Sequence, residues 1–248
     1  MTISAPLPPG QRERPDFPRF GLLPFATRFP SQTDRIDLHI SFPDSSDAAT
    51  PSTATPTNDG TDVGNPLAQL PRVEQTSDFH CVTTWTRRGL RWGGVRFADF
   101  YEQIVAPLCP ADPAAARFVV LRAQDGARTS LPLEDLLSPD VLLAVHLDGQ
   151  PLPIEHGAPL RLIAPAHYGY KSVKHLNRIE FWRSDKHYRP YGLRFMVHPR
   201  ARVALEERGQ WVPGWLLRHL YRPLIGMTVA RFERGMREQR EAQGGSQK

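Results

Sequence analysis

The feature that most constrains the fold is a succession of short apolar segments separated by turn residues. Residues 118–122, 141–146 and 178–182 each have the length and composition of a buried strand. Asp125-Gly126 and Asp148-Gly149 supply tight turns beside such segments. Because helical spacing is confined to short stretches, we expect an α+β domain made of mixed, bent sheets with short helices.

Other segments add to this pattern. Residues 36–42 alternate strictly between apolar and polar and predict a strand, and residues 129–131 and 160–164 predict two more. Apolar residues recur at helical spacing from Phe97 to Ile104, and residues 133–137 form a second short helical pattern.

The chain is long enough for one sizeable core, since 40% of its 248 residues are hydrophobic. We expect an N-terminal arm and first strand at 1–43, a flexible Ser/Thr/Pro-rich loop at 44–66, the remainder of the main domain at 67–200, and a basic amphipathic helical tail at 201–248. The loop is interpreted as a tolerated surface insertion, with a regulatory or partner-binding loop as the alternative.

The positive charge is concentrated in the tail. The formal net charge is +5, and residues 201–248 carry nine Lys/Arg against five Asp/Glu, whereas the rest carries twenty-two against twenty-one. A nucleic-acid-binding protein would need a basic surface on its main domain. No nucleic-acid partner is therefore expected.

The cysteine content and the lack of a long apolar segment indicate where in the cell the protein is expected. The two cysteines, Cys81 and Cys109, have no paired spacing, which disfavours a disulfide framework or a structural zinc site. The first residues lack an apolar leader pattern, and no stretch approaches the ~18 apolar residues that span a bilayer. We expect a soluble protein in a reducing, cytoplasmic compartment.

Cys81 is the residue with the clearest chemical signal. It lies between strand signals beside His80, where a loop would open onto a pocket. A thiolate is a soft ligand for a redox-active metal, so one cysteine suffices where a cofactor supplies other sulfurs. The alternative is a small buried hydrophobic residue, the usual fate of a free cysteine. Cys109 lacks comparable neighbours and is interpreted as structural or incidental.

Five ordered blocks of sequence resemble a known family. They are residues 80–85 (HCVTTW), 92–95 (WGGV), 131–137 (LPLEDLL), 148–152 (DGQPL) and 156–174, which ends in YGYKSVK. Together they resemble the molybdopterin-binding domain of the sulfite oxidase family over roughly residues 8–198. The likeness is to the small bacterial branch related to the methionine-sulfoxide reductase catalytic subunit.

The resemblance implies Mo-molybdopterin, with one pyranopterin per molybdenum and Cys81 as the protein's metal ligand. The cofactor-binding residues it implies are His156 and Arg161 at the pterin, Gly169, Lys171, Ser172, Val173 and Lys174 in the phosphate-binding loop, and Arg19 and Phe20 in the N-terminal arm. The alternatives are a solvated basic loop and simple hydrophobic tethering of the arm. His156 replaces an asparagine of the reductase relatives, and Ala123 replaces a threonine, so some pterin contacts must differ.

His80 is a candidate catalytic residue with two interpretations of equal weight. It either shuttles protons, because an imidazole titrates near neutral pH, or it orients the Cys81 loop. Arg87, Arg88 and Arg91 follow the cysteine but are more typical of a solvated turn than of an anion pocket.

The resemblance implies an oxidoreductase that transfers an oxygen atom to or from a small, sulfite-like or sulfoxide-like substrate. No haem-attachment motif is present, so an external electron-transfer protein is the expected partner. The alternative is a cofactor-binding but catalytically quiet interaction module.

The C-terminal tail carries an approximate apolar stripe between arginines, made up of Trp215, Leu216, Leu220, Leu224, Met227 and Phe232. Such a stripe suits peripheral contact with a membrane or with an electron-transfer partner. The alternative is that it packs against the domain.

Overall fold

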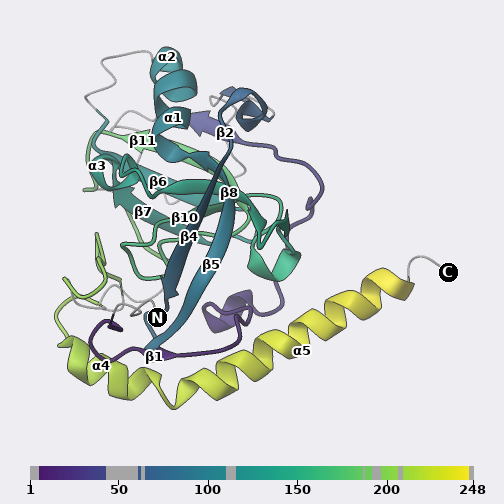
Figure 1. Cartoon of the computed structure of the whole chain (residues 1–248), viewed down its shortest axis with the longest axis vertical. Helices are drawn as coiled ribbons and strands as arrows, with labels where there is room; N and C mark the ends of the chain where they lie inside the picture. The colour runs from purple at the N-terminus through teal and green to yellow at the C-terminus, as the bar shows by residue number, and fades with distance from the viewer. Residues whose placement is uncertain are drawn as a thin grey trace, which may run out of the picture.

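The computed structural model describes residues 6–42, 61–62, 65–109, 116–186, 188–191, 197–205 and 209–245. These residues form two mixed β-sheets with short helices at their ends, and two further helices cross one end of the domain (Figure 1). The expected α+β class with mixed sheets, short helices and a C-terminal helical extension is confirmed.

The first sheet is organised around one long hairpin. Its strands are β1 (Arg12–Glu13), β4 (Val73–His80), β5 (Trp85–Arg96), β8 (Leu142–Leu147), β9 (Gln150–Pro151) and β10 (Arg161–Ile163). β4 and β5 pair antiparallel, whereas β1 joins β5 in parallel. The hairpin therefore presents residues 81–84 at one end of the sheet.

The second sheet has the order β3-β2-β11-β6-β7. Its strands are β2 (His39–Ser41), β3 (Thr61–Asp62), β6 (Phe118–Ala123), β7 (Arg128–Pro132) and β11 (Leu176–Trp182). β2 runs parallel to β11, and the other neighbours are antiparallel. The loop between β10 and β11 consequently connects the two sheets.

The main core is formed by side chains from both sheets. Val95 and Leu143 of the first sheet and Leu121 and Ile179 of the second are fully buried in one cluster. β6 and β8 read as nearly continuous apolar runs because both of their faces are covered, as in buried central strands. This burial is the main stabilising contribution that holds the two sheets together.

The short helices cap the ends of strands. They are α1 (Phe97–Phe100), continued by a π-helical turn at Tyr101–Val105 into α2 (Ala106–Leu108), and α3 (Leu133–Leu136). Phe97 and Phe100, three residues apart, both point into the main core, which accounts for the helical spacing seen in the sequence.

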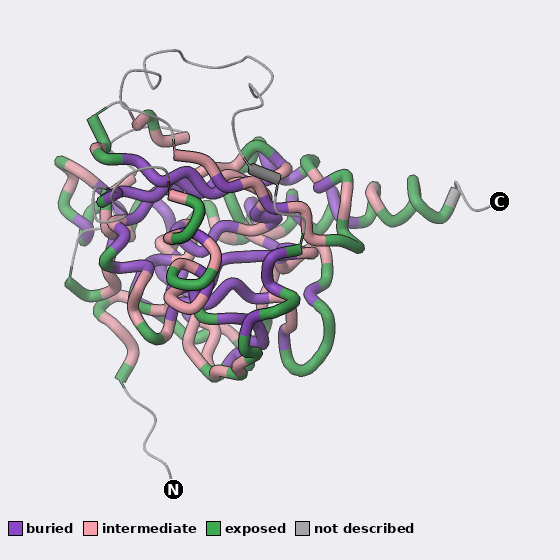
Figure 2. The backbone as a smooth tube through the Cα atoms, turned by 90° about the horizontal axis from the view of Figure 1, so that it is seen from above, coloured by how far each residue is buried: buried purple, intermediate pink, exposed green. Residues whose placement is uncertain are grey.

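The C-terminal extension comprises α4 (Gly214–Tyr221) and α5 (Leu224–Gly245) and packs against the domain. Leu217, Tyr221, Phe232 and Met236 on its inner side are buried. Between the two helices, Arg222 donates from Nη2 to the carbonyl of Gly10 at 3.0 Å and from Nε to Thr84 Oγ1 at 3.2 Å. The far end of α5 projects from the body, with mostly exposed residues (Figure 2).

The expected single stripe on the tail is therefore wrong in one respect. Of its six residues only Phe232 is buried, whereas Trp215, Leu216, Leu220, Leu224 and Met227 are exposed. The reason is that the inner side of the extension uses a different set of positions, including Leu217 and Tyr221. No helix in the described parts of the chain is both long enough and apolar enough to cross a bilayer.

Two other expectations are only partly covered by the structure. Most of the 44–66 loop lies outside the described residues, but Thr61–Asp62 within it forms β3 and pairs with β2. The strand predicted at 36–42 is shorter, spanning His39–Ser41. The four segment boundaries given above otherwise stay a prediction.

Candidate active site

Cys81 begins the four-residue turn that joins β4 to β5. Its N–H donates to the carbonyl of Trp85 at 2.8 Å, and its own carbonyl accepts the N–H of Thr84 at 3.1 Å. Gln11 also donates from Nε2 to the Cys81 carbonyl at 3.1 Å. Thr84 adopts φ +79°, a left-handed conformation that lets the turn close. The backbone of Cys81 is therefore fixed from three directions.

The Cys81 thiol lines a cavity of about 240 Å³. The residue is only 7% exposed, and Sγ lies 3.1 Å from Thr83 Oγ1. Cys109 is more exposed and is not part of this lining. The structure thus places the Cys81 thiol, the predicted metal ligand, in the wall of this cavity.

Segments that lie far apart in the sequence meet around this cavity. Most of the lining side chains are aromatic or aliphatic, and a smaller group is charged. The lining includes Arg19, Phe20, Phe25, Phe79, Trp85, Asp125, Arg128, Gly169, Tyr170, Ser172, Val173, Lys174, Tyr188, Tyr191, Tyr221 and Phe232. Of the predicted cofactor-binding residues, the structure brings Arg19, Phe20, Gly169, Ser172, Val173 and Lys174 together with Cys81.

Lys174 is the cation whose charge is most sensitive to this environment. Nζ donates to the carbonyl of Phe20 at 3.1 Å and lies 6.0 Å from the centre of the Phe232 ring. Burial, followed by the neighbouring charges of Arg19 and Arg161, lowers the pKa of Lys174 to about 7. A bound anion would restore the ammonium form.

Several buried N–H donors at the cavity lack an acceptor among the residues that the structure describes. They are Nε of Arg19, Nε of Arg128 and Nε1 of Trp85. A buried donor without a partner costs free energy, so such groups commonly meet a ligand or water. A phosphate-bearing, acceptor-rich cofactor fits this set of donors together with the Lys174 ammonium. The chemistry of the cavity is therefore compatible with the expected group.

Arg161 and His156 lie behind the cavity lining. The Arg161 guanidinium donates to the carbonyls of His156 at 2.7 Å and Ser172 at 3.2 Å, and it lies 5.0 Å from the Trp92 ring. Burial lowers its pKa to about 9. The His156 ring stacks on Phe17 with centroids 4.5 Å apart. In this structure both residues shape the loop; contact with a pterin stays a prediction.

The loop between β10 and β11 is tied to the Cys81 hairpin. Gly169 donates its N–H to the His80 carbonyl at 2.8 Å, and a Cβ at this position would collide with the Phe79 ring. Ser172 Oγ accepts the Ala164 N–H at 3.1 Å. This loop therefore reaches the cavity with Gly169 packed directly against the Phe79 ring, which would have to move to accept a side chain there.

Lys171 is directed elsewhere. Nζ donates to the carbonyls of Ser130 at 2.7 Å and Pro199 at 2.6 Å, and the residue is fully buried. Its ammonium links the loop to Ser130 of β7 and to the segment at Pro199. The predicted cofactor contact by Lys171 gains no support from this geometry, because its donors are already directed at carbonyls.

His80 lies beside Cys81 but does not line the cavity. Its Nδ1 is 2.9 Å from Thr86 Oγ1, and burial lowers its pKa below 6.5. Together with its backbone bond from Gly169, this arrangement favours the interpretation that His80 orients the loop. The proton-shuttle role stays a prediction.

Sequence reasoning missed several residues of the lining. Asp125 was interpreted only as part of a turn, yet it is buried, and burial raises its pKa. Tyr221 and Phe232 come from the C-terminal helices and close the cavity from a side that no local pattern indicates. The amphipathic pattern around Phe232 was visible, but it does not specify the surface on which the helix packs.

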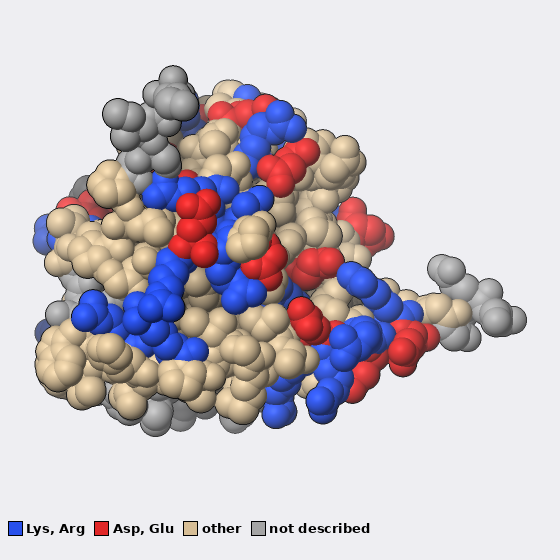
Figure 3. Space-filling view, turned by 60° about the horizontal axis from the view of Figure 1, so that its bottom comes forward, with Lys and Arg blue, Asp and Glu red and all other residues tan. Residues whose placement is uncertain are grey.

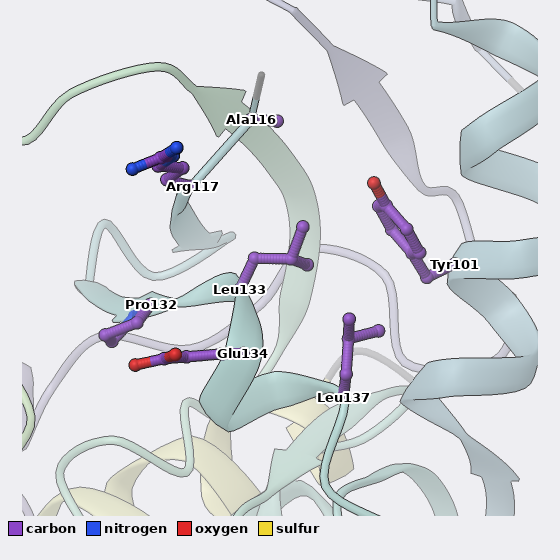
Figure 4. Close-up of a pocket in the computed structure, with 7 residues that line it drawn as sticks. All are labelled: Tyr101, Ala116, Arg117, Pro132, Leu133, Glu134 and Leu137. Atoms are coloured by element: carbon purple, nitrogen blue, oxygen red, sulfur yellow. The ribbon is translucent and has the colours of Figure 1, made fainter. Parts of the chain in front are cut away.

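A second hollow, of about 700 Å³, lies at another part of the molecule (Figure 4). Tyr101, Leu133 and Leu137 line it together with Ala116, Arg117, Pro132 and Glu134. None of the predicted site residues takes part. It also lacks a thiol, so the metal-binding chemistry expected from the sequence belongs to the smaller cavity.

Acid should destabilise the folded protein through His175, which is fully buried next to Lys174. Burial lowers the pKa of His175 to about 3 from 6.5. Between these values the unfolded chain takes up a proton that the folded chain refuses, so the free energy of unfolding falls as the pH drops below about 6.5. The expected loss from pH 7 to pH 5 is about 1–2 kcal/mol for this group.

Urea denaturation at the two pH values measures this loss. His175→Gln should reduce the difference, and His219→Gln, at an exposed site on α4, should leave it unchanged. An equal pH response in all three proteins would contradict the assignment to His175.

The family described as "Oxidoreductase molybdopterin binding domain" matches residues 64–189, which is just over half of the chain. The chain belongs to this family. The match covers the Cys81 hairpin and the loop with Lys174, whereas the N-terminal arm and the C-terminal helices lie outside it. Among the cavity residues, Arg19, Phe20, Tyr221 and Phe232 lie outside the matched range.

Curated relatives agree with this assignment. The chain is 41% identical over 116 residues to the "Uncharacterized oxidoreductase YuiH" of Bacillus subtilis, covering 47% of this chain and 56% of the relative. It is 33% identical over 124 residues to the protein-methionine-sulfoxide reductase catalytic subunit MsrP of Xanthomonas campestris, covering 46% and 38%. It is 35% identical over 124 residues to human mitochondrial sulfite oxidase, covering 47% and 22%.

These matches confirm the resemblance to the sulfite oxidase family and its reductase-related branch. They also confirm the expected class of enzyme, a molybdopterin-dependent oxidoreductase, and the expected cofactor. The aligned part spans between 22% and 56% of the length of these relatives. Substrate and electron partner therefore need an argument from this chain.

Proposed function

We propose that the protein transfers an oxygen atom to or from a small substrate at a molybdenum cofactor held by Cys81. The observation that carries the proposal is a buried thiol in a cavity that also holds the Lys174 ammonium and unpaired N–H donors. When bound, the cofactor supplies two-electron redox chemistry at its metal. The protein supplies the ligand, the orientation and the exclusion of water.

Each part of the cavity has a distinct task. The Cys81 thiolate binds the metal, and the turn hydrogen bonds fix its direction. Lys174 and the unpaired Nε donors of Arg19 and Arg128 line the cavity, where they would neutralise and hold a phosphate. Phe79 and Trp85 form apolar walls that keep bulk water away from the reacting atoms.

An uncharged oxo donor such as a sulfoxide suits the cavity better than sulfite. Arg87, Arg88 and Arg91 are absent from the lining, and Arg88 lies against Glu13 with its Nε 3.4 Å from the carboxylate. The cations that do line the cavity, Arg19, Arg128 and Lys174, are assigned above to the phosphate of the cofactor, and aromatic side chains are the largest group in the rest of the lining. Reduction of a sulfoxide consumes two electrons and two protons and yields a sulfide and water.

The two electrons need a donor other than the cavity thiol, and Cys109, the second free cysteine that the structure describes, lies outside the cavity lining. We propose an external electron-transfer protein as the donor. A cytoplasmic location is part of the same proposal and rests on the two unpaired cysteines.

The test is metal and activity analysis of protein purified from a host that makes the cofactor. Because one pyranopterin is expected per molybdenum, we expect about one molybdenum per chain. We also expect the protein to reduce a methyl aryl sulfoxide when an artificial electron donor is supplied. Sulfite oxidation should be much slower. Protein that carries the cofactor but turns over neither substrate would favour the quiet interaction module, and protein without molybdenum would contradict both readings.

A further inference from the structure

The C-terminal helices and the turn before α4 present large apolar side chains to solvent. Trp211 is 76% exposed, Trp215 61%, Leu220 57% and Met227 55%. Leu216 and Leu224 add to the same exposed set. We call these six residues the outer apolar face. Water-exposed apolar groups in such a cluster indicate a binding surface.

Packing of the inner side holds this face outward. Leu217 and Tyr221 of α4 and Phe232 of α5 are buried against the domain, and Arg222 fastens the junction between the helices to Gly10 and Thr84. The outer apolar face cannot turn inward without giving up these contacts. It is therefore a fixed feature of the folded protein rather than an unpacked tail.

The charges within the segment that carries this face have one sign. Residues 211–232 contain Arg218, Arg222 and Arg231 and no aspartate or glutamate. In Figure 3 an uncharged area at the lower left borders a band of Lys and Arg side chains. Arginine beside exposed tryptophan and leucine suits a surface that is apolar beneath a layer of negative charge.

We propose that the outer apolar face binds the surface of an anionic lipid membrane. Its apolar side chains enter the boundary between headgroups and acyl chains, where tryptophan is favoured, and its arginines pair with lipid phosphates. The helices lie on the membrane and do not span it. A protein partner or a second copy of this chain would need an acidic complement, whereas a lipid phosphate layer provides one uniformly.

Sedimentation with vesicles tests this proposal on the full-length holoenzyme. We expect binding to phosphatidylcholine vesicles that contain phosphatidylglycerol, weaker binding at high salt, and little binding to phosphatidylcholine alone. Trp215→Glu combined with Leu220→Glu should lower the bound fraction by roughly tenfold or more. Leu108→Glu, on α2 at the opposite end of the molecule, is the matched control (Figure 1).

Light scattering and oxidoreductase activity separate the other outcomes. Failure of the wild type to bind anionic vesicles, or equal binding by the double variant, would overturn the proposal. So would a dimer that the double variant abolishes, since a second copy would then cover the face. Activity in solution should stay unchanged in the double variant, so the result does not depend on the proposed reaction.

Discussion

Cys81→Ser is expected to abolish oxidoreductase activity, with a loss of at least about 100-fold. Serine keeps the shape of the side chain and the turn, but its hydroxyl is a hard donor that stays protonated near neutral pH, so the metal loses its only thiolate from the protein. Because Cys81 is small and held by backbone bonds, folding should change little. Molybdenum per chain, measured by mass spectrometry, should fall together with turnover.

Cys109→Ser provides the control for this experiment. Cys109 is the other cysteine in the chain and does not line the cavity. Its substitution should leave both molybdenum content and turnover at the wild-type level. Full activity in Cys81→Ser, or an equal loss in both variants, would rule out Cys81 as the metal ligand.

Two glycines in α5 should respond to alanine in opposite directions. At Gly235 a Cβ would collide with the backbone carbonyl of Ala26, which also accepts a hydrogen bond from Arg19. At Gly226 the same Cβ would meet nothing within 4 Å. Gly235→Ala should therefore lower the free energy of unfolding by about 1–3 kcal/mol through overpacking, whereas Gly226→Ala should raise it by about 0.5–1 kcal/mol through helix propensity.

Chemical denaturation measures both changes, and hydrogen exchange shows where they act. In Gly235→Ala we expect faster exchange along α5 and around Phe25–Arg28, because the helix must move away from the N-terminal turn. If both alanine variants stabilise the protein equally, α5 does not pack on Ala26 in solution.

The strands that the sequence predicted are either nearly continuous apolar runs or, at residues 36–42, a strict alternation of apolar and polar residues. Strands β6 and β8 are recognisable because nearly every position carries an apolar residue. β4 was not recognised as an eight-residue strand, since it pairs only with β5 and carries polar residues such as Glu74, Gln75 and Asp78. A partly exposed edge strand has no such pattern.

The residues of the candidate site likewise fall into those that the sequence indicated and those that it did not. Cys81 and the loop up to Lys174 were accessible because their residues stand in ordered local blocks. The contribution of Phe232 was not, because its contacts with Phe20 and Lys174 join positions that are far apart in the chain. For Lys171 the local block gives no information on direction: its ammonium donates to the carbonyls of Ser130 and Pro199, and its predicted cofactor contact stays a prediction.

The position of Phe232 has a consequence for the order of assembly. Chains emerge from the ribosome N-terminus first, so this residue is made after every other part of the cavity lining. Both sheets can therefore pack while one wall is still missing, and the space beside Cys81 is open during that interval. At about 240 Å³ the finished cavity is smaller than the roughly 300–1,000 Å³ usual for ligand pockets. Because Tyr221 and Phe232 complete the lining, the cavity beside Cys81 is whole only once the two C-terminal helices have packed on the domain.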